Sequence, residues 1–375
     1  MKVTSILKLA SVGVWILLAG FFFISCSSPK AFRSWDPGYG MVSKIDSICN
    51  LQMKNGHLPG IGVAVASGNR NIWTKGYGYA NIEKKQMIDP RDHLFRIGSI
   101  SKSVTATALA REYEKGRINL DIPISTYYSD CPADKGNLTM KQIAGHLAGI
   151  RHYNGLEFLS NIHYTNVTDP LEVFIHDTLL YAPGERFSYS TYAWTLVSAA
   201  MEKAIDVPFT DIIAQEVSEP LHLSDLKPDQ KDSTSYHRVT FYEYQDSMHQ
   251  VSPVVDISNK WAGGGYLCSP EDLARFGYAL TAPGYLKKKT IALFTTSQTT
   301  NDEKPTSNGI GFFNGTDDAG RKWFGHSGGS VGGTSKLVIF PEQDLVVVTL
   351  INLSGADTDD LAMRIAEVIL SGKKN

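Results

Sequence analysis

Segments with the character of β-strands lie near both ends of the chain, and this arrangement constrains the fold more than any other feature. Near the N-terminus, GIGVAVASGNRNIWTKGYGYA contains two apolar, β-branched runs around Gly68-Asn69, a pattern typical of a hairpin. Near the C-terminus three similar segments follow one another: GIGFFNG, RKWFGHSGG and SKLVIFPEQDLVVVTLIN, the last with a turn at 341–344. Strands from the two ends can therefore pair into one antiparallel sheet.

The middle of the chain is predicted to be helix and loop. Apolar spacing typical of helices occurs at 100–116 and in four later segments, TMKQIAGHL, TLVSAAMEKAI, TDIIAQEV and SPEDLARFGYAL. Two further helices, at 42–55 and from about Thr358 to Leu370, are expected to flank the sheet.

These elements predict an α+β fold in one folded domain at 42–372. A sheet lobe (about 42–98 and 305–372) would carry a mainly helical lobe (about 99–304) inserted between its strands. Ligands usually bind in the cleft between two such lobes, so the active site is expected there.

The N-terminus predicts export from the cytoplasm. Lys2 and Lys8 flank a short basic start, followed by an unbroken run of apolar or small residues at 9–25. Phe23-Ile24-Ser25-Cys26 resembles a lipobox, which implies a signal peptide at 1–25, a lipidated Cys26 and a tether at 26–41. The alternative is a retained signal anchor, because the run just reaches the length that spans a bilayer. The favoured interpretation is a bacterial lipoprotein held at a membrane by its lipid, in the periplasm or at the cell surface, with the outer membrane preferred.

Composition excludes several other classes of protein. With 375 residues and 42% hydrophobic content, the chain can bury a substantial core. A formal net charge of −2 implies no nucleic-acid partner.

Besides Cys26, the cysteines are Cys49, Cys131 and Cys268, whose wide separation predicts neither a disulfide framework nor a metal site. One disulfide or three unpaired thiols remain open, and no cofactor is expected.

The stretch RIGSISKSVTATALA contains Ser99-x-x-Lys102 at the point where the chain enters the helical lobe. Residues three apart on a helix are neighbours, so Lys102 can place its amine beside the Ser99 hydroxyl. The N–H groups at a helix start favour developing negative charge. A nucleophile, a base and help for an oxyanion are what acyl transfer by serine needs. The pattern alone is weak, because it also begins at Ser5, Ser27, Ser224 and Ser371.

A lysine base must lose its proton, which requires burial and a neighbouring group that shares the proton. A tyrosine hydroxyl can act as that neighbour. Three tyrosines stand in a Tyr-x-Asn/Thr pattern: Tyr79, Tyr164 and Tyr189. Tyr189 is preferred, because in PGERFSYSTYAW a Pro-Gly turn and a short extended run lead directly into a helix. The alternative for Tyr189 is a packed core aromatic.

Near the C-terminus, His326-Ser327-Gly328-Gly329 stands at the end of a predicted strand. Glycines let a substrate approach the backbone closely, and a free N–H there can serve as an oxyanion donor. Taken alone, the segment is equally consistent with a glycine-rich hairpin turn.

Together and in this order, the three elements resemble the motifs of the serine β-lactamase and penicillin-binding protein superfamily: Ser-x-x-Lys, Tyr-x-Asn and Lys/His-Thr/Ser-Gly. The spacing from Ser99 to Tyr189 is similar to that of the class C β-lactamase and D-Ala-D-Ala carboxypeptidase branch. LDIPISTYY, AGHLAGIRHY and WAGGGYLCSPEDLARFG also resemble that branch, while RIGSISKS, KWAGGG and GHSGGSVGG are most similar to its animal mitochondrial serine β-lactamase-like members. The likeness covers about 56–370 and implies a β-lactamase/transpeptidase-like fold.

The resemblance implies a role for each motif residue. Ser99 would be the acylated nucleophile, Lys102 its general base and Tyr189 the group that shares or relays the proton. The N–H groups of Ser99 and Gly329 would form the oxyanion hole. The substrate-binding positions would be Thr191, His326, Ser327 and Gly328.

Two departures from the family pattern bear on activity. Thr191 stands where most relatives have Asn, and His326 stands where many have Lys. Histidine is only partly charged near neutrality, so strong β-lactam turnover is not expected. His146 is expected to support the site structurally.

These features predict a metal-free serine hydrolase that forms a covalent acyl-enzyme on peptides or peptidoglycan stem fragments. The alternatives with the same machinery are a β-lactamase and a carboxylesterase. A non-catalytic penicillin-binding-like sensor is the alternative of a different class, and intact Ser99, Lys102 and Tyr189 argue against it. The oligomeric state stays open.

Overall fold

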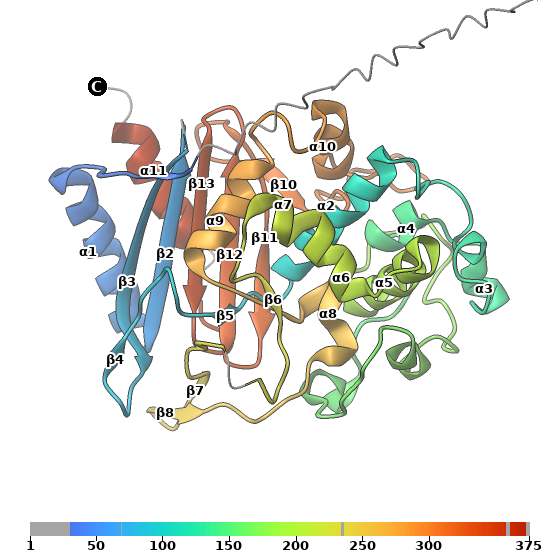
Figure 1. Ribbon diagram of the computed structural model, residues 1–375, viewed down its shortest axis with the longest axis horizontal. Helices are drawn as coiled ribbons and strands as arrows, with labels where there is room; N and C mark the ends of the chain where they lie inside the picture. The colour runs from blue at the N-terminus through green and yellow to red at the C-terminus, as the bar shows by residue number, and fades with distance from the viewer. Residues whose placement is uncertain (1–30, 69, 234–235, 358–360, 373–375) are drawn as a thin grey trace, which may run out of the picture. The chain divides into compact units, whose positions relative to one another are not determined.

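A large sheet built from both ends of the chain lies at the centre of the fold (Figure 1). The computed structural model describes residues 31–68, 70–233, 236–357 and 361–372. In these residues the strand order is β1-β3-β2-β13-β12-β11-β10, and β4 pairs with β3. The bounds are β1 (Arg33–Ser34), β2 (Gly60–Ser67), β3 (Asn71–Asn81), β4 (Gln86–Met87), β10 (Phe313–Thr316), β11 (Lys322–Ser330), β12 (Gly333–Phe340) and β13 (Leu345–Ile351).

The N- and C-terminal strands meet where β2 pairs with β13, with Ala64 opposite Val348. Neighbouring strands from β3 to β10 are antiparallel, and the short strand β1 adds to β3 in parallel. The predicted hairpin is present as β2–β3. The predicted α+β class, with one sheet formed from both ends of the chain, is therefore confirmed.

Both faces of the central strands are covered, and their residues alternate between two cores. On β2, Ile61, Val63 and Val65 belong to the core under α1 (Tyr39–Asn55) and α11 (Leu361–Gly372). The alternate residues of β2 are alanines or glycine and face the second core, which α9 (Pro270–Ala279) helps to close. Small side chains are needed here, because a Cβ on Gly62 would lie 2.5 Å from the ring of Pro270.

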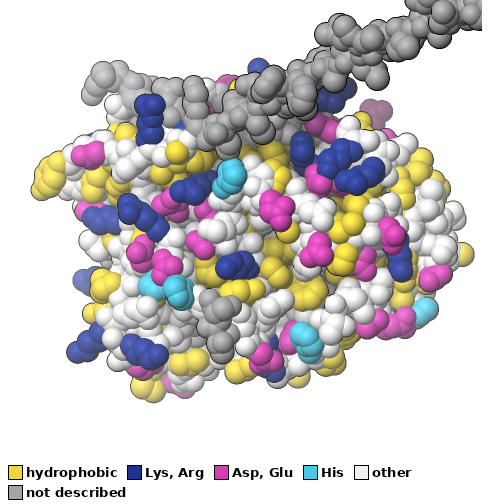
Figure 2. Space-filling view, viewed as in Figure 1, with side chains coloured by type: hydrophobic (Ala, Val, Ile, Leu, Met, Phe, Trp, Pro, Cys, Tyr) yellow, Lys and Arg dark blue, Asp and Glu magenta, His cyan; other side chains and the backbone are white. Residues whose placement is uncertain are grey.

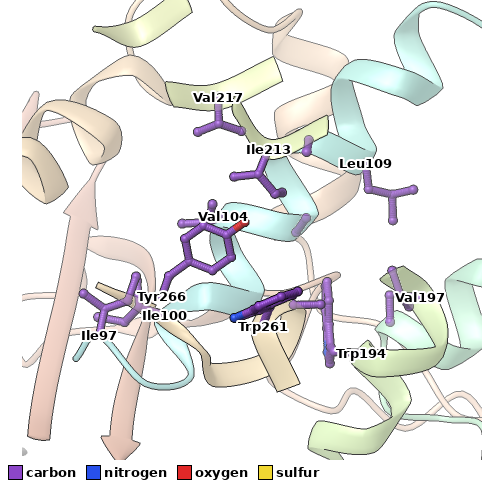
Figure 3. Close-up of a cluster of buried hydrophobic side chains, with 14 of the residues drawn as sticks. Ile97, Ile100, Val104, Leu109, Trp194, Val197, Ile213, Val217, Trp261 and Tyr266 are labelled. Carbon is purple, nitrogen blue, oxygen red and sulfur yellow. The ribbon is translucent and has the colours of Figure 1, made fainter. Parts of the chain in front are cut away.

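The helical lobe is built around α2 (Ile100–Glu114), which is buried on nearly all sides. Figure 3 shows Ile100, Val104 and Leu109 of this helix in a cluster with Trp194 and Tyr266. A helix that is buried all round serves as the core of its lobe. The other helices of the lobe are α3 (Ala133–Gly136), α4 (Met140–Ala144), α5 (Thr191–Ile205), α6 (Phe209–Ile213), α7 (Glu219–Leu221), α8 (Trp261–Gly264) and α10 (Lys288–Thr295).

Short elements connect these helices. The 3₁₀ turns are η1 (Ile124–Thr126), η2 (Gly155–Leu159), η3 (Asp169–Val173) and η5 (Ser258–Lys260), and η4 (Ala214–Ser218) is a π-helical turn. Two small sheets complete the described chain: β5 (Phe95–Arg96), β9 (Tyr266–Cys268) and β6 (Lys227–Pro228) form one, and β7 (Tyr242–Gln245) with β8 (Met248–Val251) forms the other.

The structure differs from the sequence-based boundaries in two places. Part of the segment expected as a tether pairs with the edge of the sheet as β1. The N–H groups of Arg33 and Trp35 donate to the carbonyls of Arg70 and Ile72, both at 2.9 Å. Helix α9, expected in the helical lobe, packs on the sheet. The predicted N-cap Thr358 lies outside the described residues, and α11 is described from Leu361.

Cys49, Cys131 and Cys268 are buried free thiols. Among the described residues no helix is both long and apolar enough to cross a bilayer, whereas the predicted signal peptide and Cys26 lie outside those residues. On the face shown in Figure 2, basic and acidic side chains are interspersed, in keeping with the balanced net charge.

Candidate active site

Ser99 is the first residue of the site and stands at the N-cap position of α2. Its side chain is partly exposed, whereas the neighbouring Ser101 and Ser103 are fully buried. The Ser101 hydroxyl accepts the N–H of Tyr266 at 3.2 Å, and the Ser103 hydroxyl donates to the carbonyl of Gly311 at 2.7 Å. Of these three serines, Ser99 alone combines access with a position at the helix start.

Lys102 is fully buried one helical turn along α2. Its Nζ lies 3.0 Å from Ser99 Oγ and 3.1 Å from Thr191 Oγ1, and it donates to the carbonyl oxygen of Gly263 in α8. Burial, followed by the positive charge of Lys260, holds the pKa of Lys102 well below its ordinary value. A neutral amine has two N–H donors and one lone pair. Gly263 and Thr191 can accept the two donors, which aims the lone pair at the Ser99 hydroxyl.

Tyr189 lies beside this pair, close enough for the Ser99 side chain to act on the pKa of its hydroxyl. Its ring centroid is 4.8 Å from Lys102 Nζ. Burial raises the pKa of Tyr189, and the effect of the Ser99 side chain offsets only part of this rise. A phenol that keeps its proton is suited to donate that proton to a leaving group rather than to act as the resting base.

The start of α5 fixes the direction of Tyr189. The next residue, Ser190, is the N-cap: its Oγ accepts the N–H of Ala193 at 3.1 Å and donates to the carbonyl of Arg151 at 2.6 Å. The other two tyrosines of the same pattern lie elsewhere: Tyr79 is exposed on β3, and the N–H of Tyr164 donates to Ser258.

Two histidines hold the backbone of this segment. Nδ1 of His146 accepts the N–H of Ser190 at 3.1 Å, and Nδ1 of His152 accepts the N–H of Thr191 at 3.2 Å. Burial, then the charge of Lys102, lowers the pKa of both rings, to about 4 for His152. Both rings are therefore neutral near pH 7. The support expected of His146 has a physical basis, while His152 received no role from its place in the sequence.

His326 differs from the expectation of a partly charged residue. It is buried on β11, and burial with the charge of Lys102 lowers its pKa to about 3. Its Nδ1 donates to the carbonyl of Ser327 at 2.6 Å, and its ring centroid lies 4.5 Å from that of Phe313 and 6.2 Å from that of Tyr189. A neutral imidazole in an aromatic setting supplies no cation for a substrate carboxylate.

Thr191, expected among the substrate-binding residues, contacts the lysine amine. Its side chain is buried, its hydroxyl contacts Lys102, and it lies close enough to Tyr153 to lower the pKa of that phenol. Thr191 therefore positions the lysine amine, although it lacks the amide of the family's Asn.

The C-terminal half of β11 brings Gly329 to Ser99. Strand β10 covers β11 only as far as Gly325, which leaves the edge of His326 to Ser330 without a paired strand among the described residues. Ser330 pairs with Gly333 at the closed end of a two-residue hairpin, so by antiparallel alternation the N–H of Gly329 points away from β12 toward the open edge.

Glycines allow this close approach. Gly98 has φ +49°, and a Cβ there would lie 2.9 Å from the nitrogen of Gly329. A Cβ on Gly328 would lie 2.1 Å from the carbonyl oxygen of Ile97. Ser327, directly before Gly328, is partly exposed. The structure thus brings the helix start and the open strand edge together, and all residues predicted for the site converge here.

Residues 45–370 match the family model described as Beta-lactamase. The human mitochondrial serine β-lactamase-like protein LACTB is 26% identical, over 82% of this chain and 76% of its own length. The octameric penicillin-binding protein homologue from Pyrococcus abyssi has a TM-score of 0.77 at 24% identity, covering 88% of this chain and 77% of that one. The D-amino acid amidase from Ochrobactrum anthropi SV3 has a TM-score of 0.76 at 18% identity, covering 90% and 99%. Because the family model spans most of the chain, this protein belongs to the β-lactamase family.

Proposed function

We propose that this protein is a serine hydrolase that forms a covalent acyl-enzyme on Ser99. The observation that carries the proposal is the fully buried Lys102, whose Nζ lies 3.0 Å from Ser99 Oγ and 4.8 Å from the centroid of the Tyr189 ring. A nucleophile held between a neutral amine and a phenol is prepared for proton transfer in both directions.

In the proposed acylation step, Lys102 takes the proton of the Ser99 hydroxyl as Oγ bonds to the substrate carbonyl carbon. The carbonyl oxygen becomes an oxyanion, which accepts hydrogen bonds from the N–H groups of Ser99 and Gly329. The bond to the leaving amine or alkoxide then breaks. Tyr189 gives its proton to the leaving group and recovers one from the Lys102 ammonium.

In deacylation water is the nucleophile and Lys102 is again the base. The water loses a proton to Lys102, its oxygen bonds to the acyl carbon, and Ser99 Oγ leaves and takes a proton back from the Lys102 ammonium. The products are a carboxylic acid and free enzyme. The atoms and protons of the two proposed steps balance without a metal or cofactor.

The favoured substrates are peptides or peptidoglycan stem fragments. The open edge of β11 supports this choice, because the backbone groups at Gly329 and Ser327 can pair with an extended peptide. A β-lactamase or a carboxylesterase would use the same residues and remains the alternative.

The direct test is labelling of the purified protein with a fluorophosphonate, followed by mass spectrometry. We expect one adduct, on Ser99, because Ser101 and Ser103 are buried and their hydroxyls are hydrogen bonded elsewhere. Ser99→Ala should abolish labelling, with Ser101→Ala as the matched control that retains it. An adduct on a different serine would sink the assignment.

Hydrolysis of small peptides or esters is expected to exceed β-lactam turnover. A neutral His326 offers no cation to the carboxylate of a bicyclic β-lactam. Losing one charge-assisted hydrogen bond costs about 1.5–3 kcal/mol, roughly ten- to a hundred-fold in rate. The measurement compares kcat/KM for nitrocefin with that for the best substrate from a peptide and ester panel. His326→Lys should improve nitrocefin turnover, and a wild-type preference for nitrocefin would make the protein a β-lactamase instead.

The lipid anchor at Cys26 also stays a proposal, supported by the lipobox-like Phe23-Ile24-Ser25-Cys26 in the sequence. In a bacterial host with lipoprotein processing, we expect the protein in the membrane fraction and Cys26→Ser in the soluble fraction or uncleaved. Cys49→Ser is the matched control and should fractionate with the membranes. Identical fractionation and migration of Cys26→Ser and wild type would instead favour a retained anchor.

A further inference from the structure

A second buried lysine, Lys260, lies close to the site and takes no part in the proposed steps. It is 3% exposed and stands immediately before α8. Its Nζ donates to the carbonyl of Phe158 at 3.1 Å and lies 4.6 Å and 4.8 Å from the ring centroids of Phe158 and Tyr153. Burying an amine costs free energy, which contacts such as this carbonyl and these aromatic rings offset.

Two short connections join Lys260 to the amine of Lys102. Along the chain, the helix that begins after Lys260 supplies the Gly263 carbonyl that accepts from Lys102. Through space, the Lys260 ammonium rests on the ring of Tyr153, the Thr191 side chain lies close enough to act on the pKa of the Tyr153 hydroxyl, and Thr191 contacts Lys102. Figure 3 shows the next residue, Trp261, within the buried cluster that surrounds α2.

No carboxylate pairs with Lys260 in the described part of the chain. The carboxylates of two neighbouring segments are engaged elsewhere, since Glu157 pairs with Arg151 and Asp256 with His163. The titratable and cationic groups that act on Lys260 or feel its charge are Arg96, Lys102, His152 and Tyr153. Burial and then the charge of Arg96 lower the pKa of Lys260 to about 7. Lys260 is thus charged on the acidic side of neutrality.

We propose that Lys260 is an electrostatic positioning residue whose ammonium charge opposes protonation of Lys102 and so keeps the acylation base neutral. The inference rests on the proposed function of Lys102. Below about pH 7 Lys260 carries its charge, and a positive charge in a poorly hydrated interior disfavours a second ammonium on Lys102.

Loss of the charge on Lys260 should change the pH dependence of the acylation rate. Acylation requires neutral Lys102, so its rate falls as pH drops through the pKa of Lys102. Removing the charge at position 260 raises that pKa, and the acidic limb of the rate profile should move to higher pH by about one unit. A residue with a purely structural role would lower the rate at every pH without moving the limb.

The experiment measures the rate of fluorophosphonate labelling of Ser99 against pH, which needs no knowledge of the natural substrate. Lys260→Gln removes the charge but can still donate to the Phe158 carbonyl, and Lys260→Met removes both. Lys260→Arg is the matched control, because a guanidinium keeps the charge and stacks well on aromatic rings. We expect the limb to shift in the Gln and Met variants and to stay in place in the Arg variant.

The possible outcomes separate the two proposals. If the wild type is not labelled at Ser99, the proposed function fails. If the wild type is labelled and either folded uncharged variant keeps the wild-type limb, only the inference about Lys260 is overturned. It is likewise overturned if both uncharged variants fail to give a native thermal transition, since Lys260 would then be structural.

Discussion

Replacing Lys102 with methionine is expected to slow acylation of Ser99 by at least about 100-fold, the usual scale for loss of a general base. The wild-type amine lies 3.0 Å from Ser99 Oγ, and its burial keeps it neutral. Methionine has a similar volume and no basic atom, so the fold is retained while the serine proton has no acceptor. The measurement is the second-order rate of fluorophosphonate labelling above pH 7.

The matched control is Lys288→Met, the same change at an exposed position in α10. It should leave the labelling rate at the wild-type value. Thermal unfolding of both variants establishes that they are folded. Wild-type labelling of a folded Lys102→Met protein would remove Lys102 from the mechanism and assign the proton to Tyr189 or to solvent.

Asp229→Ala is expected to lower the free energy of unfolding by about 3–5 kcal/mol, the range for breaking a buried ion pair from one side. Asp229 accepts from Nε of Arg96 at 2.7 Å, and the two side chains are 1% and 7% exposed. Arg238 lies 3.2 Å away on the other carboxylate oxygen. The variant therefore leaves two guanidinium groups without their shared partner.

Asp229→Ala should also slow the reaction of Ser99, because Arg96 connects the Asp229 ion pair to the active site. Arg96 also donates to the carbonyl of Val331 at 2.8 Å, directly after the strand that carries Gly329. Arg96 ends β5, shortly before Ser99 in the chain. It therefore joins the segment that carries Ser99 to the segment that carries Gly329, and these two residues supply the proposed oxyanion donors. We expect slower Ser99 labelling together with the lower stability.

Urea denaturation measures the first effect. Asp302→Ala is the matched control, because Asp302 forms an exposed pair with Lys304, and such pairs contribute little to stability. It should leave the transition unchanged. If Asp229→Ala unfolds at the same urea concentration as wild type, the Arg96 pair contributes no net stability.

The sequence by itself determined the features that depend on near neighbours. Alternation and β-branched runs predicted the β2–β3 hairpin and the C-terminal strands, and residues three apart on a helix placed Lys102 beside Ser99. Both follow from the repeats of regular secondary structure, which any short window of sequence carries. A Pro-Gly turn before a helix singled out Tyr189, and the order of the three motifs added its role and that of Gly329 through resemblance to a family.

Tertiary structure decided the chemistry of the site, because protonation depends on burial and on charges contributed by distant segments. His326 was expected to be partly charged, yet its position among Phe313, Tyr189 and Lys102 makes it neutral. Thr191 was expected at a substrate-binding position, and its packing against α2 and α8 brings its hydroxyl to the lysine amine. Lys260 had no local signature at all. Each outcome required segments far apart in the chain to pack together and exclude water, and no local pattern records that event.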